Sequence, residues 1–363
     1  MQITDVKVEA YDLGRDFRWG GRRSMDVQAV LLTLEGEDGQ QGNALAWTAE
    51  LPVRAAVAGI EEAAAPLLFG ADPLDRPRIL APLWRAFRVG LPLPVIGIVD
   101  VALWDLAARA EDLSVADMLG RQRDRVRGCA SAPPVETPED CEAMVDELVE
   151  AGFRAIKLHV CGDLATDIAV SRAARRAAGD DVDLMMDAMA VYDRHAARSL
   201  GYVLDDLDFR WYEDPLSDED LEGWRDLRRL LATPIAGADS VRFTVRDYGR
   251  PAAAGAFDIV RMDAARNGIT ELRALADLAA ALGLRCEGHS FGSALGQAAN
   301  LQVALSISNG DFFELPVPIG GLDVGVQEGL ELDEDGFVVA PDGPGLGLEI
   351  DPDALAARRI DFD

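Results

Sequence analysis

The sequence predicts an α/β protein: a modified TIM barrel of the (β/α)7β type joined to a smaller α+β capping domain. Three observations lead to this prediction. The chain has 363 residues, too many for one ordinary compact core unless that core is a barrel of roughly 250 residues. Its first third changes from strand-like alternation to helical periodicity. From residue 125, short apolar strands then alternate with amphipathic helices at a regular period.

The capping domain is predicted over residues 1–124. Alternation of apolar and polar residues indicates strands in ITDVKVEAYDL and in VQAVLLTLEGEDGQQGNALAW, with a turn at EDGQ. Helical periods follow at 53–68 and 74–90, and a long one runs from Gly97 to Gly120. Strands followed by helices are typical of an α+β unit.

The barrel is predicted over residues 125–330. Its eight strands are spaced 23 to 29 residues apart and begin at positions 126, 155, 183, 210, 234, 257, 285 and 312. Helical segments such as TELRALADLAAALG separate most of them, which is the pattern of a (β/α)8-type barrel. The last strand precedes PVPIGGLDVGVQ, too rich in Gly and Pro for a helix, so we expect the last helix to be missing. Residues 331–363 are turn-rich and are expected to return to the capping domain.

The net charge and the cysteine pattern indicate which partners and which compartment to expect. The formal net charge is −29, and Lys7 and Lys157 are the only lysines, so we expect no nucleic-acid and no membrane partner. The four cysteines form no CxxC, and MQITDVKVEAYDL lacks the pattern of a signal peptide. These features predict a cytoplasmic protein. A mechanism that requires two facing catalytic lysines is nearly excluded.

Charged side chains gather where the predicted barrel strands end, which is where barrel enzymes carry their catalytic groups. In chain order they are Lys157, His159, Asp187, Glu213, Asp239, Asp263, His289 and Glu314. Five carboxylates at one mouth repel each other unless a cation lies among them. Asp187, Glu213 and Asp239 are spaced 26 and 26 residues apart on successive strands, and they form a hard oxygen-ligand set suited to one Mg²⁺.

This arrangement suits removal of a proton next to a carboxylate. A divalent cation and hydrogen-bond donors stabilise the enediolate that forms. His289 is the best candidate base, with Asp263 fixing its tautomer, while Lys157 can neutralise a substrate carboxylate oxygen. His159 shares the facing of Lys157 and is a candidate acid or base on the opposite side. Glu314, if protonated, is a candidate donor to the enediolate.

Several segments carry a specific resemblance. The residues IKLH, MMDAMA, YEDP, IAGADS, RMDAARNGIT, GHSFGSALGQAAN and FFELP resemble the barrel signatures of the mandelate racemase group of the enolase superfamily. GIVDVALWDLAARA and PDGPGLGLEI resemble the flanking segments of that family, so the similarity spans nearly the whole chain. The resemblance implies that Asp187, Glu213 and Asp239 bind Mg²⁺, that Asp263 and His289 form a catalytic dyad, and that Glu314 and Lys157 assist.

The chain departs from the family pattern at three positions. His159 stands where the family usually has a second lysine that serves as a base, which weakens the case for two-base racemisation. Asp239 stands where this group more often has glutamate, and Met189 where the family often has asparagine. The resemblance also implies loops of the capping domain that contact substrate and a homo-oligomer, from dimer to octamer. The candidate contacts are Trp19, Arg22, Arg23 and Trp47.

The favoured function is that of a lyase: Mg²⁺-dependent dehydration of a sugar acid, a small-molecule carboxylate, to a 2-keto-3-deoxy acid. A racemase or epimerase that uses His159 and His289 is the second reading, and a sugar-lactone cycloisomerase, also an isomerase, is the third. A catalytically silent barrel that acts as a binding protein is the alternative from another class. The complete set of acid, base and ligand side chains argues against it.

Overall fold

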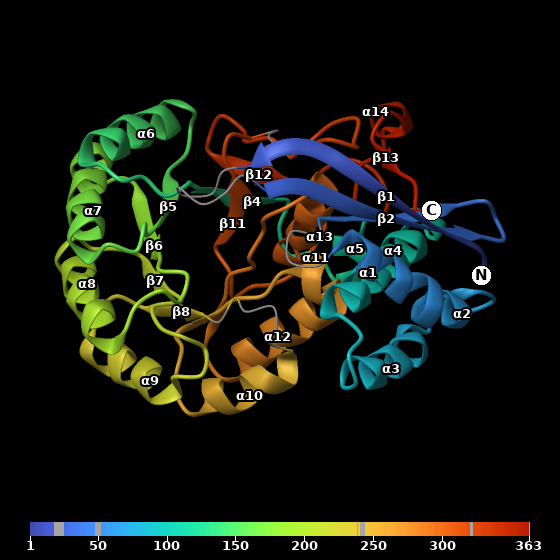
Figure 1. The fold of residues 1–363 in the computed structure, drawn as a ribbon, viewed down its shortest axis with the longest axis horizontal. Helices are drawn as coiled ribbons and strands as arrows, with labels where there is room; N and C mark the ends of the chain where they lie inside the picture. The colour runs from blue at the N-terminus through green and yellow to red at the C-terminus, as the bar shows by residue number, and fades with distance from the viewer. Residues whose placement is uncertain (18–24, 48–51, 238, 240–243, 320–321, 363) are drawn as a thin grey trace.

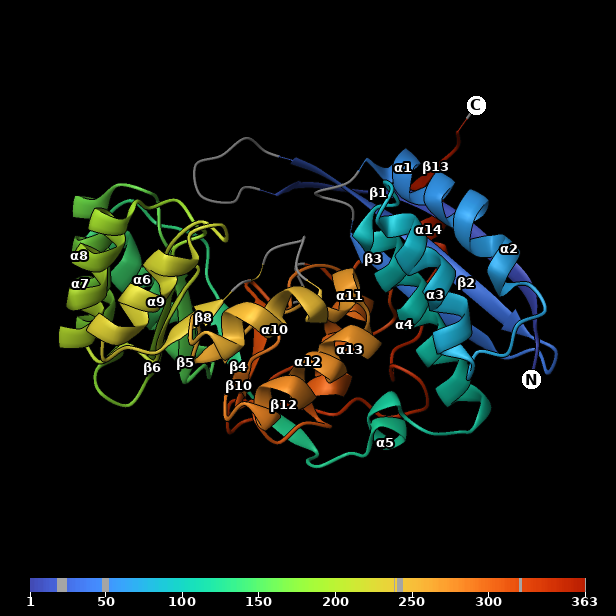
Figure 2. The ribbon, with the colours of Figure 1, turned by 90° about the horizontal axis from the view of Figure 1, so that it is seen from below.

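The computed structural model describes residues 1–17, 25–47, 52–237, 239, 244–319 and 322–362. Two lobes are visible in Figures 1 and 2, a curled sheet of parallel strands surrounded by helices and a cap built on an antiparallel sheet. The predicted fold class is therefore confirmed.

The cap sheet has four strands in the order β13-β1-β2-β3. Its members are β1 (Ile3–Phe17), β2 (Met25–Gly36), β3 (Gln41–Trp47) and β13 (Arg359–Ile360). The predicted turn at EDGQ joins β2 to β3, where the amide of Gly39 donates to the carbonyl of Gly36. Gly39 has a positive φ of 80°, which only glycine adopts without strain. From the cap, β1 and β2 reach toward the barrel lobe (Figure 2).

The cap helices follow the predicted periods, with one difference. α1 (Val53–Gly59), a π-helical segment (Ile60–Ala64) and α2 (Ala65–Leu68) cover the first predicted helix, and α3 (Arg76–Phe87) covers the second. The pattern that we read as one helix from Gly97 to Gly120 is two, α4 (Leu93–Ala110) and α5 (Val115–Leu119). The break has a local cause: Asp112 takes a positive φ of 54°, and Ser114 caps α5 by accepting from the amide of Asp117.

Helix α4 joins the two lobes. It is buried on nearly every side from Leu93 to Ala108, as expected for a helix packed between a sheet and a second layer. Asp100 accepts hydrogen bonds from the amide and hydroxyl of Thr270 in the barrel lobe. Gly97 contacts the backbone of Arg266 so closely that a Cβ there would lie 2.4 Å from its carbonyl oxygen. Neither α4 nor any other helix of the described residues is long and apolar enough to cross a membrane.

All eight predicted barrel strands are present and parallel, in the order β11-β4-β5-β6-β7-β8-β9-β10. Their bounds are β4 (Arg125–Ser131), β5 (Ala155–His159), β6 (Asp183–Asp187), β7 (Trp211–Glu213), β8 (Ile235–Gly237), β9 (Ile259–Val260), β10 (Arg285–Cys286) and β11 (Phe312–Pro316). Most of their residues are buried, as in sheets that are covered on both faces.

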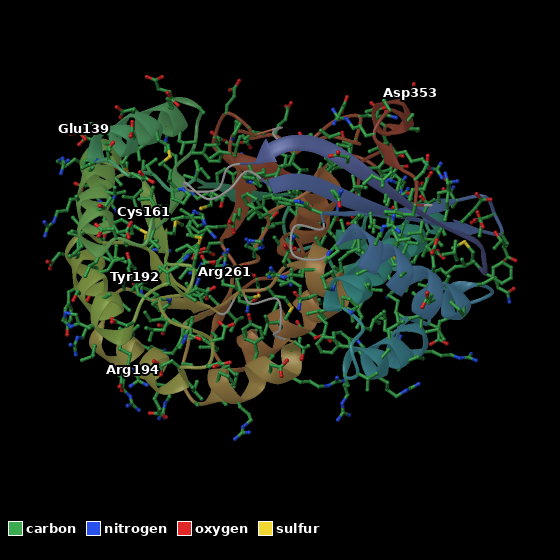
Figure 3. The ribbon with its side chains drawn as sticks, in the orientation of Figure 1. Glu139, Cys161, Tyr192, Arg194, Arg261 and Asp353 are labelled. Carbon is green, nitrogen blue, oxygen red and sulfur yellow. The ribbon has the colours of Figure 1, made fainter. Side chains whose placement is uncertain are left out.

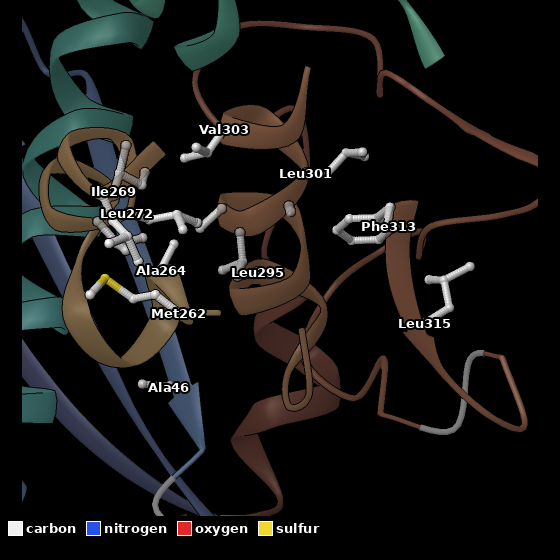
Figure 4. Close-up of a cluster of buried hydrophobic side chains, with 14 of the residues drawn as sticks. Ala46, Met262, Ala264, Ile269, Leu272, Leu295, Leu301, Val303, Phe313 and Leu315 are labelled. Atoms are coloured by element: carbon white, nitrogen blue, oxygen red, sulfur yellow. The ribbon is translucent and has the colours of Figure 1, made fainter. Parts of the chain in front are cut away.

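Helices separate the strands as the sequence predicts. They are α6 (Pro138–Glu150), α7 (Leu164–Ala178), α8 (Arg194–Asp206), α9 (Leu221–Leu230), α10 (Val245–Ala253), α11 (Ala264–Asn267), α12 (Ile269–Ala281) and α13 (Ala294–Ala304). α13 packs between two neighbours, with Val303 pointing toward Ile269 of α12 and Leu301 toward Phe313 of β11 (Figure 4).

The segment after β11 has no barrel helix in its described part. It instead contributes β12 (Phe337–Val339), which pairs antiparallel with β4 of the barrel. The chain then runs to the cap, where α14 (Pro352–Ala356) precedes β13. The tail that we expected to return to the capping domain thus first adds a strand to the barrel sheet.

The two strands at the ends of the barrel sheet, β10 and β11, are joined without a regular ladder. No pairing between β10 and β11 is present in the described residues. The amide of Cys286 donates to the carbonyl of Asn309, and the buried carboxylate of Glu287 accepts from the amides of Asp311 and Phe312 at 3.1 and 3.0 Å. One side chain therefore supplies much of the closure of the barrel.

We expect Glu287→Ala to lower the free energy of unfolding by about 2–4 kcal/mol, because the amides of Asp311 and Phe312 lose a buried charged acceptor. Urea denaturation followed by circular dichroism measures the change. Glu147→Ala, at an exposed position of α6, is the control and should shift stability by less than about 0.5 kcal/mol. Equal stability of the Glu287 variant and wild type would show that the closure does not depend on this carboxylate.

Candidate active site

The eight predicted catalytic and metal-binding residues lie on barrel strands or directly after them. Lys157 and His159 lie on β5, Asp187 on β6, Glu213 on β7 and Glu314 on β11, while Asp239, Asp263 and His289 follow β8, β9 and β10. The register places His159 opposite Asp187, and Asp187 opposite Glu213. The parallel sheet therefore brings residues that are far apart in sequence to one edge of the barrel.

Lys157 lies at the centre of the carboxylates and is 1% exposed. Its Nζ lies 2.9 Å from Oε1 of Glu314, 3.3 Å from either oxygen of Glu213 and 3.5 Å from Oδ2 of Asp187. Burial by itself lowers the pKa of Lys157, but the charges of Glu213 and Glu314 outweigh it and the pKa is raised. The ammonium group therefore stays protonated.

A second buried cation, Arg261, was not among the predicted site residues. Its Nε donates to Oε1 of Glu213 at 2.9 Å, and its second terminal nitrogen bonds to Oε2 of Glu314. Figure 3 shows Arg261 inside the barrel lobe. The signal that could have found it is period-2 alternation: Arg261 is two residues before Asp263 and thus shares its facing. We had read it only as part of an apolar strand.

His289 and Asp263 form the predicted pair. Nδ1 of His289 lies 3.0 Å from Oδ2 of Asp263, and the other oxygen of Asp263 accepts from Nδ2 of Asn300 and from the amide of Ala265, each at 2.8 Å. Because Nδ1 donates a hydrogen bond to this carboxylate, Nε2 is the nitrogen available for chemistry. Nε2 lies 3.4 Å from Oδ2 of Asp239.

The negative charges around His289 control its titration. Burial alone lowers the pKa of His289, but Asp239, Glu314 and Asp263 outweigh it, so the pKa is raised above its ordinary value of about 6.5. A raised histidine pKa stabilises the folded state below pH of about 6.5, and this stabilisation is lost as the pH rises through the folded-state pKa.

His159 lies across the mouth from this dyad, on β5. Its Nδ1 lies 2.7 Å from the carbonyl oxygen of Ala132, which can only accept, so Nδ1 carries a proton. Nε2 lies 3.4 Å from Oδ2 of Asp187. The ring is thus oriented by a backbone carbonyl, whereas the ring of His289 is oriented by a carboxylate.

Asp239 is paired with Arg266, whose terminal nitrogen bonds to Oδ1. Arg266 follows β9, and its guanidinium reaches the residue that follows the neighbouring strand β8. Behind Asp239, the carboxyl group of Asp214 accepts from the Asp239 amide at 3.3 Å. Burial raises the pKa of Asp214 well above its usual range, which favours the neutral form.

Glu314 was expected to donate a proton only if its carboxyl group is protonated, and its surroundings favour the ionised form. Burial alone raises its pKa, but the adjacent charges of Lys157 and Arg261 outweigh burial and hold the pKa well below the usual range. In this conformation Glu314 is therefore a carboxylate that accepts hydrogen bonds. The donors that face it, Lys157 and Arg261, are the groups able to give hydrogen bonds at this point of the site.

The three predicted metal ligands are carboxylates, which suit Mg²⁺, but each forms an ion pair with a lysine or arginine side chain. No three His, Cys, Asp or Glu side chains converge as a metal site in the described part of the chain. Asp187 faces Lys157, Glu213 faces Lys157 and Arg261, and Asp239 faces Arg266. When all five carboxylates of the mouth are ionised, they exceed these three cations by two charges. One divalent cation matches that excess.

The four cap residues predicted to contact substrate are placed only in part. Trp19, Arg22 and Arg23 lie outside the described residues. Trp47, at the end of β3, packs against Phe291 with ring centroids 5.6 Å apart, and Phe291 lies 6.5 Å from the ring of His289. Trp47 is therefore linked to the loop that carries His289.

The arrangement of a cap over a barrel mouth lined by acids, a lysine and a His–Asp pair is that of the enolase superfamily. Residues 22–120 match the family "Mandelate racemase / muconate lactonizing enzyme, N-terminal domain", and residues 140–354 match "Enolase C-terminal domain-like". The chain belongs to the mandelate racemase/muconate lactonizing enzyme family, and the predicted resemblance is confirmed.

Relatives in this family catalyse several reactions. The chain is 30% identical to the D-galactarolactone cycloisomerase of Agrobacterium fabrum over 99% of both chains. It is 32% identical to the L-talarate/galactarate dehydratase of Salmonella typhimurium over 73% of this chain and 68% of that protein. The solved structure of a D-glucarate dehydratase from Agrobacterium tumefaciens complexed with magnesium has a TM-score of 0.89 and 30% identity, covering 99% of this chain and 100% of that one. Another relative is the N-succinylamino acid racemase of Amycolatopsis, 32% identical over 71% of this chain and 70% of that protein.

We expect Asp263→Asn to lower the pKa of His289, because the variant removes a negative charge that favours the imidazolium. The measurement is an NMR titration of the side chains of the three histidines in metal-free protein. His195, exposed at the start of α8, is the internal control and should titrate unchanged. An unaltered titration of His289 would contradict the pairing.

Proposed function

We propose that this protein is a Mg²⁺-dependent dehydratase that converts a sugar acid into a 2-keto-3-deoxy acid. The observation that carries the proposal is the His289–Asp263 pair, a base oriented by a carboxylate. It lies at a mouth that also holds Lys157 and a set of carboxylates that exceeds its cations by two charges. The dehydratases and sugar-lactone cycloisomerases among the relatives support a sugar-acid substrate.

Asp187, Glu213 and Asp239 would hold the cation. Asp187 would rotate away from Lys157 and Asp239 away from Arg266, while Glu213 would keep its hydrogen bond with Arg261. When bound, the cation would neutralise the charge that builds up on the substrate carboxylate as the α-proton leaves. Three carboxylate ligands leave coordination positions open for substrate oxygens, which suits Mg²⁺. Lys157 lies among these ligands and would donate to the same carboxylate of the substrate.

His289 or His159 accepts the α-proton, and the electrons of the broken C–H bond form the enediolate. Elimination then breaks the bond between the β-carbon and its hydroxyl oxygen, and His289 gives a proton to the departing hydroxyl, which leaves as water. The enol that remains tautomerises to the 2-keto acid. Nε2 of His289 serves in these transfers because Nδ1 is bonded to Asp263.

A racemase or epimerase is the second candidate, and one observation favours it. His159 is oriented on the opposite strand with Nε2 toward the metal ligands, so a second group is available to return a proton from the other face. A sugar-lactone cycloisomerase shares the first step and differs in the bond broken next.

The test is a screen of a sugar-acid library with Mg²⁺, read for 2-keto-3-deoxy product, with parallel NMR in D₂O. We expect keto product from wild type and a loss of at least about a thousandfold in His289→Asn, because the proton acceptor is removed. His195→Asn makes the same replacement at an exposed site and should retain full activity.

The other outcomes separate the alternatives. Deuterium at the α-carbon without loss of water would replace the dehydratase by the racemase or epimerase. Lactone opening or closure without keto product would favour the cycloisomerase. Absence of Mg²⁺ binding in calorimetry would contradict the metal-dependent proposal and would favour a binding protein.

A further inference from the structure

Four charged side chains form a closed ring inside the barrel. Lys157, Glu213, Arg261 and Glu314 come from or directly follow β5, β7, β9 and β11, which are alternate strands of the sheet. The contacts run from Lys157 to Glu213 at 3.3 Å, from Glu213 to Arg261 at 2.9 Å, from Arg261 to Glu314, and from Glu314 back to Lys157 at 2.9 Å. Alternate strands supply one layer of a barrel core, so these residues are one layer of alternating charge.

The layer lies directly above an apolar one. The residues two positions earlier on the same strands are Ala155, Trp211, Ile259 and Phe312, which belong to a buried apolar cluster. The rings of Trp211 and Phe312 are 5.6 Å apart, and the guanidinium carbon of Arg261 lies 5.7 Å from the ring of Trp211. The charged ring therefore rests on a closed apolar floor and faces the mouth on its other side.

Both carboxylate oxygens of Glu213 accept hydrogen bonds from side chains inside the barrel. Oε1 accepts from Nε of Arg261 at 2.9 Å, and Oε2 accepts from Nε1 of Trp211 at 3.1 Å. The two donors are planar groups on neighbouring layers, and both keep their protons at any physiological pH. They fix the plane of the carboxylate more tightly than a flexible ammonium group does.

Arg261 itself is held in place by backbone contacts. Its amide donates to the carbonyl of Gly237 at 3.1 Å, and its carbonyl accepts from the hydroxyl of Tyr248. The residue is 1% exposed and is bonded to Glu213 and Glu314, so it acts through these side chains. Such outer contacts set the orientation of metal ligands.

We propose that Arg261 and Trp211 are positioning residues that orient the carboxylate of Glu213 toward the cation, and that Arg261 couples this ligand to Glu314 across the barrel. The inference rests on the proposed function, in which Glu213 is a metal ligand. It gives a role to two residues that take no part in the proton transfers.

Two variants that preserve net charge test the proposal. Arg261→Lys keeps the positive charge but lacks the planar fork that reaches Glu213 and Glu314 together. Trp211→Phe keeps an aromatic ring but loses the N–H that donates to Glu213. Arg228→Lys is the matched control, since the Arg228–Asp258 pair lies outside the mouth.

The readout is the Mg²⁺ dissociation constant from calorimetry in the absence of substrate, together with the melting temperature of the metal-free protein. We expect a 10- to 100-fold weaker affinity, roughly the effect of losing an outer contact to a metal ligand, in both variants and none in Arg228→Lys. The metal-free proteins should remain folded. If Arg261→Lys does not fold, Trp211→Phe decides.

The outcomes distinguish this inference from the proposed function. Failure of wild type to bind Mg²⁺ would remove the proposed function and this inference with it. Wild-type binding with equal affinity in both variants would overturn only the positioning role. Weaker binding that is matched by a similar loss in Arg228→Lys would also overturn it, because the effect would then follow from general destabilisation.

Discussion

The site depends on the compensation of buried charge in the ring of Lys157, Glu213, Arg261 and Glu314. An isolated charge at such depth costs several kcal/mol, and removal of one partner from a buried pair leaves the other uncompensated. In the ring each charge has two neighbours of opposite sign. The barrel supports this because alternate strands deliver their side chains to the same height.

The charged ring lies between the apolar interior of the barrel and the side chains at its mouth, and these two parts differ in function. Below it, apolar side chains such as Trp211 and Phe312 fill the interior. Above it, Asp187, Asp239 and the His289–Asp263 pair lie at the strand ends, where loops and the cap approach. Stability is thus supplied by the lower layers, while the upper layer keeps the side chains whose charge and orientation suit proton transfer. The connection between them is Glu213, which belongs to the ring and to the proposed ligand set.

The sequence was sufficient to predict the barrel strands, the cap sheet and the convergence of the charged strand ends, because period and facing are local properties. The sequence was less informative about which charged side chains are buried inside the barrel and which groups they contact there. Arg261 alternates with Asp263, but nothing in the pattern says that its guanidinium bridges two carboxylates from strands 48 and 53 residues away. The state of Glu314 likewise follows from neighbours that only the fold assembles. Helical periodicity continued across the break at Asp112 because a short turn hardly changes the pattern. The roles of Trp19, Arg22 and Arg23 stay predictions.

The joint between β10 and β11 bears on how the spacing of side chains at this barrel mouth could change. Strands that share a ladder also share a register, so a shift in one displaces the side chains of the other. His289 follows β10 and Glu314 lies on β11, and Glu287 joins these strands through a side chain. The heights of His289 and Glu314 are therefore not fixed by a ladder between their own two strands. A barrel with one such seam can adapt the spacing of two reactive groups to a new substrate while the remaining seven strand pairs keep their alignment.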